Sequence, residues 1–140
     1  MKRRSVWYWI STGLVVFAFV FGGIADLGRG PDMVAAMQHL GYPEYLLVVL
    51  GVWKLLGAAA IVAPGVPRLK EWAYAGMMFD LTGAAVSHAA VGDPAANVIV
   101  PLVLLGLVAA SWVLRPESRR LATAAAPSES VRGRREALAT

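Results

Sequence analysis

The chain has 140 residues, of which 58% are hydrophobic and 16% charged, and its formal net charge is +4. This composition is more apolar than that of ordinary soluble domains and indicates a protein whose solvent is lipid. The sequence contains no cysteine, which excludes disulfides, thiolate nucleophiles and thiolate metal sites. The basic residues stand at the ends of apolar segments rather than on one face with interleaved aromatics, so we expect no nucleic-acid partner.

Four apolar segments follow one another along the chain, at residues 6–25, 45–63, 72–92 and 94–114. Each is about long enough for a helix that crosses a hydrocarbon core of roughly 30 Å. Backbone groups in lipid must be satisfied within the segment, which requires helices. The first segment follows basic residues as a signal peptide does, but no small-x-small cleavage site ends it, so we expect it to be retained. The sequence therefore predicts an all-α membrane domain, residues 1–114, built as a four-transmembrane-helix bundle.

Two regions lie outside these segments. The stretch GPDMVAAMQHLGYP has Pro31 where a helix can begin and Gly41 where it can end, with apolar residues at helical spacing between them. We expect a short amphipathic helix here, in the first outer loop; the alternative is an ordinary connecting loop. Residues 115–140 mix charge with Ala, Ser and Pro and have little apolar material to bury, which predicts a disordered cytoplasmic tail.

The lysines and arginines predict the orientation. Eleven of them precede the first segment, separate the second from the third, or follow the fourth, whereas only Arg29 stands in the other two loops and Lys54 lies within a segment. Because cationic loops stay on the cytoplasmic side, both termini are predicted to be cytoplasmic. Aromatic residues near the segment ends, including Tyr8, Trp72 and Tyr74, are expected at the membrane interface.

Two side chains of opposite charge lie in the middle of apolar segments. Lys54 is at the middle of the second segment, and Asp80 lies about two residues, or roughly 3 Å, from the middle of the third. The short PGVPRLK connection makes these helices antiparallel neighbours, so the two charges fall at nearly the same depth. An isolated charge there costs about 2.5–3.5 kcal/mol, and we expect the two to pair. Such a pair has a ligand or proton role, or it only fixes the register of the helices.

A polar stripe continues along the third segment, because Asp80, Ser87 and His88 share one helical face with small residues. This helix runs outward, so His88 lies in the outer half, near the depth of Asp26 at the end of the first segment. We expect a ligand pocket along the stripe that opens toward the outer leaflet, with His88 and Asp80 as orienting groups. The alternative for His88 is a hydrogen-bonded helix contact. Glu71 is expected at the cytoplasmic boundary, where the helix dipole favours an acid.

Three stretches carry a resemblance to a known family: RLKEWAYAGMMFDLTGAAVSHAAVGD, LGVWKLLGAAAIVAPG and FAFVFGGIADL. Over about residues 6–112 the chain resembles the DoxX-like family of small four-helix membrane proteins. The resemblance implies a bacterial cytoplasmic-membrane protein, and it associates the wider relatives with quinone-linked oxidation or with redox and stress complexes. The family's characteristic polar set falls on Lys54, Glu71, Trp72, Asp80, Ser87 and His88.

The sequence contains no phosphate-binding glycine loop, HExxH motif or GxSxG motif. It therefore assigns no catalytic and no metal-binding residue, and it leaves enzyme status open while favouring a non-enzyme. Three classes of function remain. The first is a subunit or partner of a membrane complex that binds a quinone-like lipophile, with a membrane protein or a second copy as its candidate partner. The second is a proton-linked carrier of a small solute, and the third is a structural or chaperone-like component whose polar centre only specifies packing.

Overall fold

The structure is a computed structural model that describes residues 2–121. Every regular element in this range is helical, so the all-α prediction is confirmed. The elements are α1 (Lys2–Gly28), α2 (Pro31–His39), α3 (Tyr45–Val62), α4 (Pro67–Ala90), α5 (Ala95–Leu114) and the 3₁₀ turn η1 (Glu117–Arg119).

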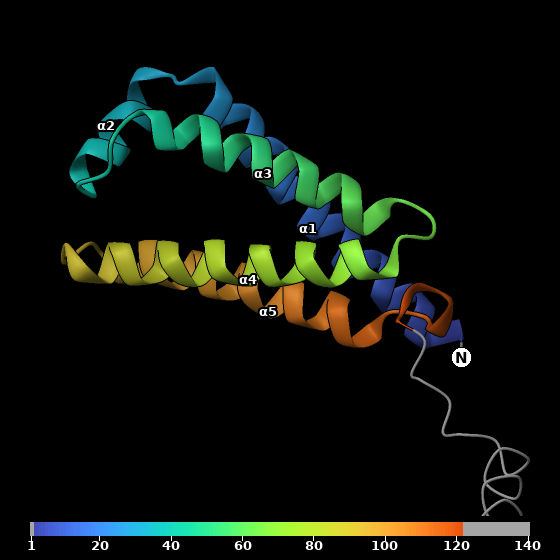
Figure 1. The fold of residues 1–140 in the computed structure, drawn as a ribbon. Helices are drawn as coiled ribbons and strands as arrows, with labels where there is room; N and C mark the ends of the chain where they lie inside the picture. Colours follow the sequence, from blue (N-terminus) through green and yellow to red (C-terminus); the bar gives the residue numbers. More distant parts are fainter. Residues whose placement is uncertain (1, 122–140) are drawn as a thin grey trace, which may run out of the picture.

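The four long helices lie against one another in a closed circuit of contacts. α1 packs on α3 and α5, and α4 packs on α5 and α3. α4 and α5 run side by side, whereas α3 and α4 diverge from their short connection toward the end where α2 lies (Figure 1). The interface between α3 and α4 is the loosest of the four, and this determines where a cavity forms.

Three helices are long and apolar enough to cross a membrane, namely α3, α5 and the Arg3–Gly28 part of α1. α4 has 24 residues, but its charged and polar side chains, including Lys70, Glu71 and Asp80, are distributed along the helix, whereas those of α1 lie mostly in its first turns. Within residues 2–121 α4 does not qualify by composition. Length and composition therefore support three spans, and the fourth stays a prediction.

The helix expected after the first apolar segment is present as α2. It begins at Pro31 and ends at His39, and Gly41 follows with a φ of 81°. Proline lacks the N–H that has no intrahelical partner in a first turn, and glycine adopts the left-handed conformation without a Cβ clash. The sequence prediction of a short helix at this place is confirmed.

The hydrophobic core lies where α1, α3, α4 and α5 meet. It consists of Val15, Phe19, Ala58, Ile61, Tyr74, Met77, Leu81 and Val108. Tyr8 and Tyr74, which the sequence placed at the membrane interface, are both fully buried. Tyr74 can turn inward because the Ser111 hydroxyl of α5 lies 2.8 Å from its own hydroxyl. The buried Tyr8 hydroxyl has no such partner among residues 2–121.

Basic residues hold one end of the molecule together. The start of α1, the α3–α4 connection and the end of α5 all lie at this end (Figure 1). Lys70 is buried, and its amine donates to the carbonyls of Ala60, at 3.0 Å, and Ala63. Arg119 donates to the carbonyl of Val62 at 3.2 Å. The last carbonyls of a helix lack intrahelical partners, so these cations stabilise the end of α3.

The predicted tail begins inside the described range. Arg115 is 3% exposed, and η1 follows it. The Arg119 guanidinium lies 4.8 Å from the ring centre of Trp9 on α1. The rest of the predicted tail, residues 122–140, lies outside the described residues, so its disorder stays a prediction.

Candidate functional site

Two glycines bring α1 and α3 into close contact and set up an ion pair. A Cβ atom at Gly23 would lie 3.0 Å from the carbonyl oxygen of Gly51, and one at Gly51 would lie 2.9 Å from that of Gly23. Backbones approach this closely only where small residues face each other. Asp26 and Lys54 each follow three residues later, on the same helix faces. Lys54 Nζ donates to Asp26 Oδ2 at 2.7 Å, and the two side chains are only 22% and 8% exposed.

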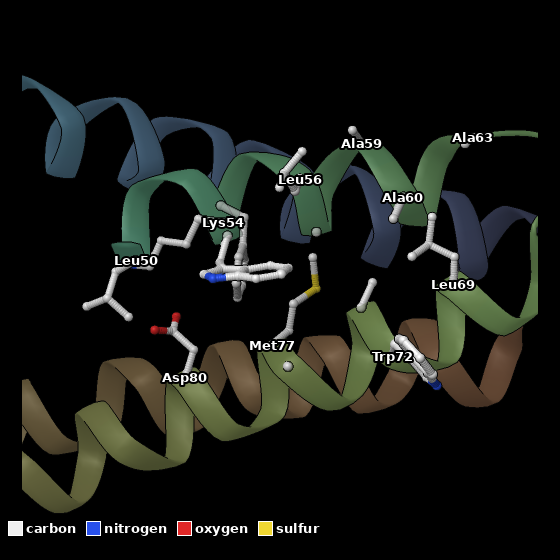
Figure 2. A pocket seen from close by; sticks show the side chains of 15 residues that line it. Leu50, Lys54, Leu56, Ala59, Ala60, Ala63, Leu69, Trp72, Met77 and Asp80 are labelled. Carbon is white, nitrogen blue, oxygen red and sulfur yellow. The ribbon is translucent and has the colours of Figure 1, made fainter. Parts of the chain in front are cut away.

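The predicted ion pair between Lys54 and Asp80 is wrong, because the Lys54 amine binds Asp26 instead. The reason is the packing: α1 approaches α3 through glycine, whereas α3 and α4 diverge. Lys54 and Asp80 nevertheless line the same cavity, and the Asp80 carboxylate points toward α3 across it (Figure 2). Among residues 2–121, no ion pair involves the Asp80 carboxylate.

This cavity, with a volume of about 640 Å³, lies between α3 and α4. We call it the α3–α4 cleft, after the two helices that supply most of its lining. Its walls are apolar except for Lys54 and Asp80, which lie near one end (Figure 2). Ala63, Leu69 and Trp72 lie at the other end, close to the α3–α4 connection. The cleft therefore combines a charged end with a long apolar wall.

The cleft opens on the outer surface of the helices. Trp53 and Trp72 line it from α3 and α4, and they are 68% and 78% exposed. On a helix that crosses a membrane, such surface faces lipid chains. A molecule dissolved in the bilayer would then reach the cleft from the side, without crossing a polar surface.

The polar stripe expected from Asp80 to His88 is divided in the structure. The cleft extends from Asp80 toward the α3–α4 connection, and His88 does not line it. His88 Nδ1 lies 2.5 Å from Asp93 Oδ2, and His39 Nε2 lies 2.6 Å from Asp93 Oδ1. The two histidines, far apart in sequence, meet on one carboxylate in the α4–α5 turn. His88 lines a second, smaller cavity of about 330 Å³ together with Pro101 and Leu104 of α5. Asp80 and His88 thus line two different cavities, and a role of His88 in binding a ligand stays a prediction.

The carboxylate of Asp93 is held in its charged form. Hydrogen bonds from His88 and then from His39 keep the pKa of Asp93 below its ordinary value. Ser87 forms a second tie nearby: its hydroxyl donates to the Gly83 carbonyl at 2.7 Å and lies 2.8 Å from the Tyr42 hydroxyl. We call the side chains of His39, Tyr42, Ser87, His88 and Asp93 the histidine cluster. It joins α2 and the following loop to the end of α4.

Glu71, which the sequence predicted at the cytoplasmic boundary of the membrane, also connects two helices. Its carboxylate accepts hydrogen bonds from Arg115 Nη2 at 2.6 Å and from Trp112 Nε1 at 2.8 Å. Arg115 also lies over the Tyr74 ring, 4.9 Å from its centre. Glu71 therefore ties the first turns of α4 to the end of α5.

Sequence reasoning missed a buried hydroxyl network. Ser111 Oγ lies 2.7 Å from Thr12 Oγ1 and 2.8 Å from the Tyr74 hydroxyl, so α1, α4 and α5 meet on it. All three side chains are buried. The available signal was a hydroxyl residue within both the first and the fourth apolar segment, but sequence alone does not show that these helices are neighbours.

Metal-binding side chains do not gather in the part of the chain that the structure describes. Among residues 2–121, no three His, Cys, Asp or Glu side chains are arranged to hold a metal ion. The histidine cluster consists of hydrogen bonds, in which each histidine nitrogen faces a different oxygen of Asp93.

The chain matches a family of known proteins over most of its length. A model of the DoxX-like family matches residues 10–111. The match covers most of α1 and all of α2, α3 and α4, and it includes Asp26, Lys54 and Asp80. No curated protein and no solved structure matches the chain.

Proposed function

The chain belongs to the DoxX-like family, and on this premise we propose that it is a membrane protein that binds a small lipophilic molecule in the α3–α4 cleft. The observation that carries the proposal is the cleft itself. Its volume of about 640 Å³ falls within the usual range for small-molecule pockets, roughly 300–1,000 Å³. Its apolar walls suit a hydrophobic body, and Lys54 and Asp80 suit a polar head.

The proposed topology has four spans with both termini in the cytoplasm. α4 can cross a membrane despite its charges, because Lys70 is bound to carbonyls of α3 and Glu71 to Arg115. The described basic residues, except Arg29 and Lys54, lie at the end that holds the α3–α4 connection, which the positive-inside rule assigns to the cytoplasm. A reporter fused at Thr140 should then be cytoplasmic and one inserted beside Arg29 external. An external C-terminus would overturn this topology.

The finer proposal is a quinone-like ligand and a role as subunit or partner of a redox or stress complex in the bacterial cytoplasmic membrane. A flat ring fits an apolar cleft that tryptophans line on both sides, and ring carbonyls could accept a hydrogen bond from Lys54. In the proposed topology the cleft lies in the cytoplasmic half of the bilayer. Because the cleft opens on the lipid-facing surface, a bound ligand would be recovered with the protein only when lipid is retained during extraction.

A cleft-filling variant tests the proposal. Gly76 lines the cleft, and a Cβ atom added there meets nothing within 4 Å. Gly76→Leu should therefore occupy the cleft without a backbone clash, and replacing a helical glycine adds roughly 0.5–1 kcal/mol of stability. Gly83→Leu is the matched control, because Gly83 lies two turns further along α4, also has free space around it and does not line the cleft.

Native mass spectrometry of gently extracted protein gives the readout. The parent and Gly83→Leu should carry a co-purified lipophile, whereas Gly76→Leu should lose it while keeping its helical content. If Gly76→Leu retains the same ligand at the same occupancy, the ligand lies elsewhere and the proposed function is wrong. If the parent carries no ligand and binds no added menadione, the proposal fails as well.

A further inference from the structure

The charged end of the α3–α4 cleft has two acidic side chains and one basic side chain. Lys54 and Asp26 neutralise each other at 2.7 Å. Asp80 faces them from α4, and within residues 2–121 its carboxylate takes part in no ion pair. The remaining neighbour of α4 adds nothing, because α5 has no titratable side chain between Ala95 and Leu114. With both carboxylates ionised, this end would carry one uncompensated negative charge.

Such a charge is costly beside an apolar cavity. A carboxylate removed from water without a partner is neutralised, either by taking up a proton or by binding a cation. The ammonium group of Lys54 is already engaged by Asp26, so it is not free to neutralise Asp80. A proton or a cationic ligand therefore fits this position better than an anion does.

The lining of the rest of the cleft indicates what the uncharged part of such a ligand must be. Its walls are apolar, so the ligand must be largely hydrophobic. Trp53 and Trp72 present exposed indole rings at the cleft, and aromatic faces attract cations. The cleft opens on the lipid-facing surface, which a lipophilic cation can reach from the membrane.

We propose that the α3–α4 cleft binds a lipophilic cation, such as a hydrophobic amine or phosphonium, whose positive charge pairs with Asp80. The cation displaces the proton of the Asp80 carboxyl group: the cation and the protonated carboxyl give the ion pair and one released proton. This inference rests on the proposed function, because it names the ligand class of the same cleft. It differs from the quinone-like ligand in requiring a positive charge.

The test compares a cation with a neutral molecule of similar shape. Tetraphenylphosphonium and triphenylmethanol are titrated by calorimetry into the full chain in lipid nanodiscs, at several pH values. Tetraphenylphosphonium should bind more tightly, and its affinity should fall by up to about tenfold for each pH unit over which Asp80 becomes protonated. Triphenylmethanol should bind with no such dependence.

Two variants separate charge from shape. Asp80→Asn should weaken tetraphenylphosphonium binding at least about tenfold and leave triphenylmethanol binding unchanged, whereas Asp80→Glu should keep the preference for the cation. Gly76→Leu should reduce binding of both molecules. The thermal stability of each variant shows that it is folded, and Gly76→Leu supplies a test that does not depend on Asp80.

The outcomes distinguish the two proposals. If both molecules bind alike, without pH dependence, and Gly76→Leu blocks both, the cleft binds lipophiles and the cation inference is wrong. If neither molecule binds, the cation inference is wrong, whereas the proposed function is decided separately by the co-purified ligand and by menadione binding. If Asp80→Asn binds the cation as tightly as the parent, Asp80 is not its partner and the inference is overturned.

Discussion

The ion pair between Lys54 and Asp26 makes the sharpest prediction about the fold. Lys54→Met and Asp26→Asn each remove one charge and leave the other with little access to water. The amine and carboxylate are 2.7 Å apart, and their side chains are 22% and 8% exposed. Breaking a buried pair from one side costs about 3–5 kcal/mol. Because Lys54 retains some exposure, we expect about 3 kcal/mol for each single change.

The double variant should be more stable than either single variant. It carries neither charge, and replacing both partners of a buried pair is often close to neutral. The coupling free energy between Lys54 and Asp26 should therefore exceed about 2 kcal/mol, well above the roughly 0.5 kcal/mol within which independent changes add. The measurement is the free energy of unfolding in mixed micelles of dodecylmaltoside and dodecyl sulfate, followed by circular dichroism.

The matched control replaces the partner that sequence reasoning proposed. Combining Lys54→Met with Asp80→Asn should give losses that add far more closely, because Asp80 lies outside ion-pair distance. A larger coupling of Lys54 with Asp80 than with Asp26 would refute the assignment. Additive losses for Lys54 and Asp26 would show that their contact does not stabilise the fold.

Two further changes test parts of the structure away from the cleft. Ser111→Ala leaves the buried hydroxyls of Thr12 and Tyr74 without the partner that joins them, so the free energy of unfolding should fall by about 1–3 kcal/mol; an unchanged value would contradict the network. Hydrogen bonds from His88 and His39 lower the pKa of Asp93. The resulting stabilisation is complete above the unfolded pKa of about 3.9 and is lost as pH falls through the lower folded value. Spin labels on α2 and on the α4–α5 turn should then stay at a constant distance down to the unfolded pKa and move apart only at lower pH, as Asp93 is protonated in the folded protein. Labelling is simple because the chain has no native cysteine; a constant distance throughout acid titration would mean that the histidine cluster does not hold this end.

Local patterns were sufficient to predict the helices. Long apolar segments require helices in lipid, and Pro31 and Gly41 marked the ends of α2 because their conformational preferences do not depend on tertiary contacts. The third segment was predicted as a helix like the others, although its charged and polar residues lower its apolar character. The structure gives it as α4 and starts it at Pro67, five residues before the apolar segment begins. The extra turn holds Lys70 and Glu71, whose partners lie on other helices.

Which side chains pair with one another across helices was decided only by the tertiary structure. The sequence gives the depth of Lys54, Asp26 and Asp80 along their helices, but depth alone does not show which carboxylate the amine reaches. That choice follows from the distance between helices: Gly23 and Gly51 let α1 approach α3, and no comparable contact closes α3 on α4. The same divergence leaves Asp80 facing a cavity. The charged residues of the candidate site could therefore be found from the sequence, whereas their pairing and the cleft between them follow from how closely each pair of helices packs.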